Sequence, residues 1–150
     1  MNREALIADL TRDEGCRLKV YDDATGQPLK PGVTIKGHPT IGIGRALDVN
    51  GIHLAEATAM LNTDIDFLVP VLSQQHWFAA LDDLRQNAVL NMAFNLGIAG
   101  LLEFHDMIRY LGDHRYELAA RAMESSTWYH QVGPRAVRLV AAIRGATATS

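Results

Sequence analysis

A change of sequence pattern near residue 50 divides this chain of 150 residues. Residues 18–47 carry alternating β-branched and aromatic side chains broken by Gly and Pro, which is typical of short antiparallel strands. From residue 53 onward, apolar residues recur at three- and four-residue spacing, as in amphipathic helices. This order predicts an α+β fold, in which a long helix joins a small antiparallel sheet lobe to a helical lobe, with a ligand-binding cleft between the lobes.

The predicted elements follow from spacing and from the breaker residues. We expect a helix over residues 3–11 that is stopped by Gly15, and strands within residues 18–23, 33–37 and 40–47. The long helix should cover residues 53–69 and bend or end at Pro70. Shorter helices are expected over residues 84–96, with a stop at Gly97, and over residues 101–111, 115–124 and 134–144. We therefore predict one domain over residues 1–150, with a sheet lobe at about 15–50 and a helical lobe made of residues 1–14 and about 53–146.

Composition excludes several classes of protein. The formal net charge of −3 lacks the basic excess that wraps a nucleic-acid backbone, so no nucleic-acid partner is expected. Cys16 is the only cysteine, so no internal disulfide is possible and folding in a reducing cytosol is expected. We see no signal peptide at the N-terminus and no apolar run that would anchor the chain in a membrane. The six histidines lack metal-ligand spacing, so we predict no metal and no cofactor.

Three carboxylates near the start of the predicted sheet could carry chemistry. Cleavage of a glycosidic bond needs a protonated carboxylic acid on one side of the sugar and, usually, a second carboxylate nearby. Eight residues separate Glu14 from Asp23, so a turn and a short strand could bring both to one rim. Asp22 competes with Asp23, because adjacent strand residues face opposite ways and only one can enter a cleft.

The residues around these acids resemble a known family. The segments DEGCRLKVYDD, TIGIGR, NTDIDFLV, LNMAFNLG and WYHQVGPRAVR occur in this order along nearly the whole chain. Together they resemble the phage-type lysozymes, the T4 lysozyme-like endolysins of glycoside hydrolase family 24. The resemblance implies a lysozyme-like fold and three catalytic residues. Glu14 would protonate the leaving oxygen, while Asp23 and Thr40 would hold the attacking water for an inverting displacement.

Further residues take roles by the same resemblance. Phe94 is expected beside the substrate, and Arg135 matches a family arginine that contacts the catalytic glutamate. Arg45 stands where the family often has histidine, so we expect an Arg45–Asp64 bridge between sheet and long helix. Sixteen residues separate Asp23 from Thr40, more than in T4 lysozyme, so residues 24–39 contain an insertion. Thr34 therefore remains a rival of Thr40.

The predicted function is that of an endolysin muramidase. It would cut the β-1,4 bond between N-acetylmuramic acid and N-acetylglucosamine in bacterial peptidoglycan and lyse the host cell. The expected enzyme is a monomer that stays in the host cytoplasm until a holin-type membrane protein releases it to the wall. A lytic transglycosylase, a chitin-type glycosidase and a non-catalytic wall-binding protein are the alternatives.

Overall fold

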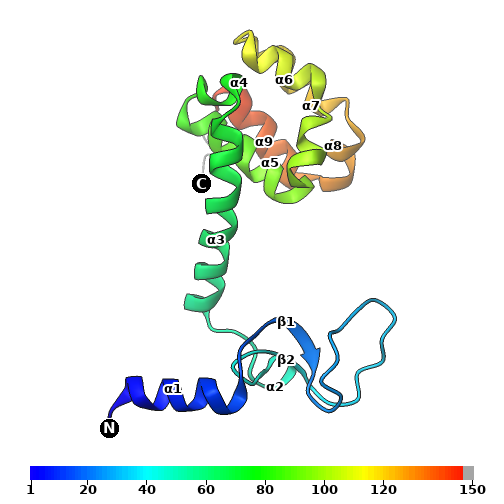
Figure 1. Cartoon of the computed structure of the whole chain (residues 1–150). Helices are drawn as coiled ribbons and strands as arrows, with labels where there is room; N and C mark the ends of the chain where they lie inside the picture. The colour runs from blue at the N-terminus through cyan, green and yellow to red at the C-terminus, as the bar shows by residue number, and fades with distance from the viewer. Residues whose placement is uncertain (147–150) are drawn as a thin grey trace. The chain divides into compact units, whose positions relative to one another are not determined.

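A computed structural model describes residues 1–146 of the chain (Figure 1). Residues 147–150, the end of the predicted domain, lie outside the described part. Contacts divide the chain into an N-terminal unit, Met1–Thr58, and a helical unit, Ala59–Ser150. The small sheet lies in the first unit together with helices, and the second unit is helical, as the sequence predicts for an α+β fold. The predicted packing of residues 1–14 with the helical lobe, and the cleft between lobes, stay predictions.

The N-terminal unit contains a three-stranded antiparallel sheet and the helices α1 and α2. Helix α1 (Arg3–Glu14) starts where the Asn2 side chain accepts the amide of Ala5, and it ends before Gly15, whose φ of 70° leaves the helical region. The strands, in the order β1-β2-β3, are β1 (Arg17–Asp22), β2 (Pro39–Gly42) and β3 (Arg45–Ala46). Helix α2 (Leu47–Asn50) follows β3 directly.

The sheet differs from the prediction at its second strand. Residues 33–37 were expected to pair but belong to the long connection between β1 and β2, which Figure 1 shows as an open loop. The amides of Lys36 and Gly37 donate to the Asp22 carboxylate instead of to a neighbouring strand. Because a side chain satisfies these donors, the segment needs no strand partner. The expected strand 40–47 is in turn split by a tight turn into β2 and β3.

The helical unit contains most of α3 and the six helices that follow it. Helix α3 (Leu54–Ser73) starts before the division and continues beyond it. The remaining helices are α4 (His76–Ala79), α5 (Asp83–Leu102), α6 (His105–Gly112), α7 (Tyr116–Glu124), α8 (Thr127–Val132) and α9 (Pro134–Arg144). Helix α9 packs against α5, α7 and α8, and α7 also packs against α6. The short helices α2, α4 and α8 were not predicted.

The apolar core of the chain lies in this unit. It includes several residues with essentially no exposed surface, among them Leu72, Met92, Leu101, Leu111 and Ile143. The indole of Trp128 is buried and packs edge-on against Phe104, with ring centroids 5.9 Å apart. Its Nε1 donates to Asn95 Oδ1 at 2.8 Å, so its polar atom is satisfied.

Two breaker residues act differently in this unit. Gly97 ends regular geometry inside α5, with φ of 73° and ψ of 162°, where the sequence predicts a stop. Pro70 does not end α3, which continues to Ser73. Because Leu72 is fully buried, core packing holds the last turn of α3 despite the backbone hydrogen bond that proline cannot donate.

Within residues 1–146 no single helix is long and apolar enough to cross a membrane. Only α5 and α6 together, bent by 100°, have the length and composition of a span.

Candidate active site

Glu14 is the last residue of α1, and its carboxylate lies against the turn between β2 and β3. A Cβ placed on Gly44 in that turn would come within 2.9 Å of Glu14 Oε2. Gly44 has a φ of +68°, a conformation that side chains rarely adopt, so glycine serves the turn and the close approach together. The Glu14 side chain is exposed. The predicted acid is therefore accessible and lies close to the β2–β3 turn.

Asp23 and Thr40 are brought together by the main chain of His38. The His38 amide donates to Asp23 Oδ1 at 2.6 Å, and the Thr40 hydroxyl donates to the His38 carbonyl oxygen at 3.1 Å. The Asp23 amide donates to the same carbonyl oxygen, also at 3.1 Å. The two predicted catalytic side chains thus both hydrogen-bond to the main chain of His38, although sixteen residues separate them in the sequence.

The two rival assignments fall on residues in different surroundings. Asp22 is 1% exposed, and its carboxylate accepts the amides of Ala24, Lys36 and Gly37. These hydrogen bonds, led by that of Lys36, lower the pKa of Asp22 below its ordinary value and outweigh the opposite effect of burial. Asp22 therefore serves as a structural acceptor, whereas Asp23 is exposed. Thr34 is exposed in the loop, whereas Thr40 lies in β2, paired with Tyr21 and Ala46.

His38 and Asp48 form a pair that sequence analysis did not identify. His38 Nδ1 lies 2.8 Å from Asp48 Oδ2 on α2. The hydrogen bond and charge of Asp48, with a smaller effect of Asp23, raise the pKa of His38, and the same hydrogen bond lowers the pKa of Asp48. The run Gly-His-Pro-Thr before the Ile-Gly turn is the only sequence signal that marks this histidine. The buried acceptor Asp22 had a clearer signal, because Asp often bonds the backbone two residues ahead in a turn.

The partner of Arg45 is Glu56, which corrects the predicted Arg45–Asp64 bridge. Arg45 Nη1 donates to Glu56 Oε2 at 2.8 Å and to the Gly51 carbonyl at 3.1 Å. Glu56 also accepts the His53 amide at 2.7 Å, and this bond contributes most to lowering the pKa of Glu56. Glu56 lies in the first turn of α3, eight residues before Asp64. The carboxylate that is nearer to Arg45 in the sequence therefore binds its guanidinium. The family assignment of position 64 did not anticipate this local competitor.

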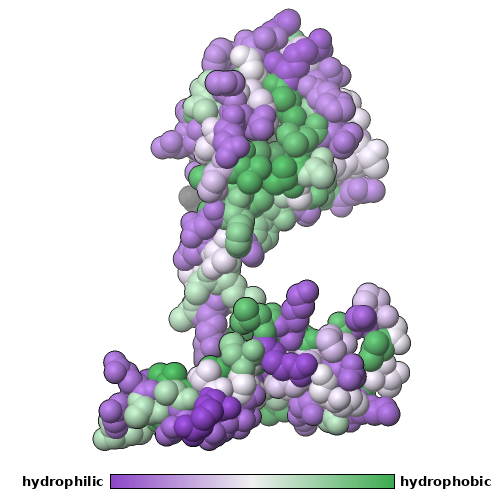
Figure 2. Space-filling model, in the orientation of Figure 1, coloured by the Kyte–Doolittle hydropathy of each residue, from purple (hydrophilic) through white to green (hydrophobic). Residues whose placement is uncertain are grey.

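Phe94 and Arg135 line one hollow in the helical unit. The hollow has a volume of about 410 Å³, and its other lining residues are Leu61, Ile65, Leu68, Asn87, Leu90 and Asn91. Arg135 donates to the side-chain and main-chain oxygens of Asn91, at 2.8 and 2.9 Å. Phe94 is 47% exposed, and Figure 2 shows apolar side chains gathered on the viewed face of this unit. The structure thus brings these two predicted residues together, while the expected contact of Arg135 with Glu14 stays a prediction.

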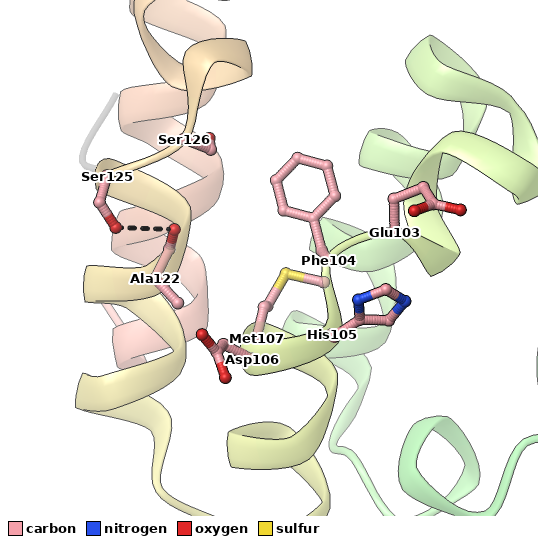
Figure 3. A pocket seen from close by; sticks show the side chains of 8 residues that line it. All are labelled: Glu103, Phe104, His105, Asp106, Met107, Ala122, Ser125 and Ser126. Atoms are coloured by element: carbon pink, nitrogen blue, oxygen red, sulfur yellow. Dashed lines mark hydrogen bonds between the residues drawn. The ribbon is translucent and has the colours of Figure 1, made fainter.

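A second hollow of about 330 Å³ lies where α6 and α7 meet (Figure 3). It contains none of the predicted site residues. Its two hydroxyls are occupied: Ser125 donates to the carbonyls of Arg121 and Ala122, and Ser126 caps α8 by accepting the Tyr129 amide. Neither serine is therefore placed with a base that could activate it.

The N-terminal unit contains all three residues that are predicted to carry acid and base chemistry. Thr40 is 3% exposed and its hydroxyl donates to the His38 carbonyl oxygen, so only the hydroxyl lone pairs remain as acceptors. Asp23 Oδ1 is held by His38, and Oδ2 makes no hydrogen bond within residues 1–146. That oxygen remains as a second acceptor. The carboxylate of Glu14, against the β2–β3 turn, is the group that is predicted to act as the acid.

Comparison with known proteins gives a consistent result. A family model described as phage lysozyme matches residues 11–142. A probable T4-type lysozyme of Dictyostelium discoideum is 33% identical over 94% of this chain and 95% of its own length. The pre-baseplate central spike protein Gp5 of Enterobacteria phage T4 is 32% identical over 87% of this chain, which spans only 26% of the spike protein.

Proposed function

Because this chain belongs to the phage lysozyme family, we propose that it is an endolysin that hydrolyses the β-1,4 bond between N-acetylmuramic acid and N-acetylglucosamine for host lysis. The family confirms the sequence-based prediction of a lysozyme-type glycoside hydrolase that acts on peptidoglycan. The bond, the stereochemistry and the biological role belong to the proposal.

One observation carries the proposed chemistry. The carboxylate of Glu14 lies against the β2–β3 turn, in the same unit in which His38 holds Asp23 and Thr40. In the proposed mechanism Glu14 gives its proton to the leaving glycosidic oxygen. Asp23 and Thr40 hold a water that attacks the anomeric carbon from the opposite face, and Asp23 takes a proton from that water. An inverting displacement needs room for this water, so we expect a carboxyl separation of about 6.5–9.5 Å between Glu14 and Asp23.

The helical unit supports the substrate in this proposal. Phe94, half exposed beside Arg135, offers an apolar face to a sugar ring. Arg135 donates to the side-chain and main-chain oxygens of Asn91 in the wall of the same hollow.

A clearing assay on purified peptidoglycan tests the chemistry. The native chain should clear the suspension, and Glu14→Gln should not, because an amide cannot donate the required proton. Glu4→Gln, on an exposed glutamate of α1, is the control for the same chemical change and should clear normally. Clearing by Glu14→Gln at the native rate would remove Glu14 from its role, and wall binding without clearing by the native chain would favour a non-catalytic binder.

Product analysis by mass spectrometry separates the enzymatic alternatives. A reducing end at muramic acid supports hydrolysis at the proposed bond, whereas a 1,6-anhydro end would identify a lytic transglycosylase. Release of sugars from chitin but not from peptidoglycan would indicate a chitin-type glycosidase.

We further propose that the enzyme acts as a monomer from the host cytoplasm and depends on a holin-type protein to reach the wall. Cells that express the native chain should remain intact until a membrane-permeabilising protein is co-expressed, and should then lyse. Lysis by the chain alone would contradict this route.

A further inference from the structure

We propose that His38 is a positioning residue, whose imidazole, held by Asp48, fixes the peptide groups that orient Asp23 and Thr40. The inference rests on the proposed function and adds a residue that the family motif leaves out. His38 lies in the segment between Asp23 and Thr40 where this chain is longer than T4 lysozyme.

The backbone of His38 is the common support of both water-holding groups. Its amide binds the carboxylate of Asp23 at 2.6 Å, and its carbonyl oxygen accepts the hydroxyl of Thr40 and the amide of Asp23. A rotation of residue 38 would therefore displace both partners together. The orientation of this one residue determines where the attacking water can be held.

Three restraints fix that orientation. Pro39 follows His38, and a proline confines the residue before it to extended backbone. Pro39 is also paired with Asp22 across the sheet. The third restraint is the imidazole, whose Nδ1 lies 2.8 Å from Asp48 on α2. Only this third restraint depends on the chemistry of the side chain, so only it can be removed without altering the strand.

The third restraint is also the one that responds to pH. The charged groups facing His38 are Asp48 from α2 and Asp23 from the residue that follows β1, and both favour the imidazolium. The folded pKa of His38 is raised above its ordinary 6.5, so the charge-assisted bond is complete below pH 6.5 and weakens as the pH rises through the higher folded pKa. A neutral imidazole can still donate to Asp48, but that bond is weaker.

The variants are chosen to separate positioning from folding. His38→Ala removes the imidazole, His38→Asn keeps an uncharged donor near the position of Nδ1, and Asp48→Asn removes the partner charge while leaving residue 38 intact. His130→Asn, on an exposed histidine of α8, is the control and should match the native chain. Each is assayed as full-length protein on a soluble peptidoglycan fragment, with kcat and KM measured from pH 5 to pH 9.

We expect His38→Ala to lower kcat about tenfold with little change in KM, since a displacement of less than 1 Å at reacting groups has this order of effect. His38→Asn should recover part of the loss. The ratio of native to His38→Ala kcat should be largest at low pH and shrink as the imidazole of the native chain loses its proton. In Asp48→Asn, hydrogen exchange of the His38 amide should be faster than in the native chain.

The results can overturn the inference without touching the proposed function. If the native chain hydrolyses peptidoglycan and His38→Ala keeps native kcat and pH dependence, His38 positions nothing. A rise in KM with unchanged kcat would make His38 a substrate contact instead. If the native chain does not hydrolyse peptidoglycan at all, the proposed function fails first, and this inference fails with it.

Discussion

Two glycines, Gly42 at the end of β2 and Gly44 in the turn that follows, allow a matched test of the position of Glu14. Gly42 and Gly44 have φ angles of +67° and +68°, so alanine strains the backbone equally at both positions. A Cβ at Gly42 meets nothing within 4 Å, whereas a Cβ at Gly44 would lie 2.9 Å from Glu14 Oε2. Gly42→Ala therefore measures backbone strain alone, and Gly44→Ala adds a direct push on the catalytic carboxylate.

The two effects have different magnitudes and different readouts. Alanine in the left-handed region costs about 1–2 kcal/mol, so thermal unfolding should detect a similar loss in both variants. Ordinary van der Waals contact begins near 3.4 Å, so the carboxylate must retreat by about 0.5 Å in Gly44→Ala. That movement costs little in stability, because Glu14 is a flexible side chain with an exposed end. A misplacement of 1 Å can cost about a hundredfold in rate, so half of that distance should cost roughly tenfold in kcat.

The assay compares kcat on peptidoglycan and the unfolding temperature for the native chain and both variants. We expect Gly42→Ala to retain most of the native kcat and Gly44→Ala to retain about a tenth of it, with similar unfolding temperatures for the two variants. Equal kcat values for the two variants would refute the placement of Glu14 against Gly44, or its role as the acid.

Three further predictions follow from buried or paired groups. The pKa of Asp22 is lowered by folding, so its carboxylate stabilises the fold above its ordinary pKa of 3.8, and this effect is lost as the pH falls through the folded pKa. Asp22→Asn should therefore lower the free energy of unfolding at neutral pH and make that free energy fall less steeply in acid. Urea unfolding from pH 7 to pH 2 measures both effects. Trp128→Phe should lower the free energy of unfolding by about 1–2 kcal/mol, because it removes the hydrogen bond to Asn95 and part of a buried indole. An unchanged urea midpoint would contradict that packing. Glu56→Gln should lower the unfolding temperature while Asp64→Asn should not, and the reverse order would restore the originally expected bridge of Arg45.

The sequence predicts those parts of the site whose conformation depends on a residue and its immediate neighbours. Gly15 ends α1 directly after Glu14, as expected from a helix-stopping glycine. Gly97 interrupts α5 for the same reason. The position of Thr40 in β2 follows from its place before the Ile-Gly turn. In each case one residue and its immediate neighbours determine the conformation.

Features that depend on distant partners could not be predicted in this way. Residues 33–37 have the composition of a strand, but the carboxylate of Asp22, fourteen residues before Lys36, accepts the amides of Lys36 and Gly37. The choice of Glu56 over Asp64 by Arg45 depends on where α3 begins, and sequence patterns locate helix ends poorly. The link from His38 to Asp48 requires α2, a single turn with no recognisable periodicity.

The anchoring of the long β1–β2 connection has a consequence for protein engineering. Asp22 ties the end of this loop at Lys36 and Gly37, and the amide of Leu29 bonded to the carbonyl of Val20 ties its beginning. Residues 30–35 between these anchors are exposed. Doubling the length of a flexible loop costs only about 0.6 kcal/mol in closure entropy. A wall-targeting peptide could be inserted there to redirect the enzyme to another bacterium. The hydrogen bonds on either side of the insertion would still hold the flanking residues.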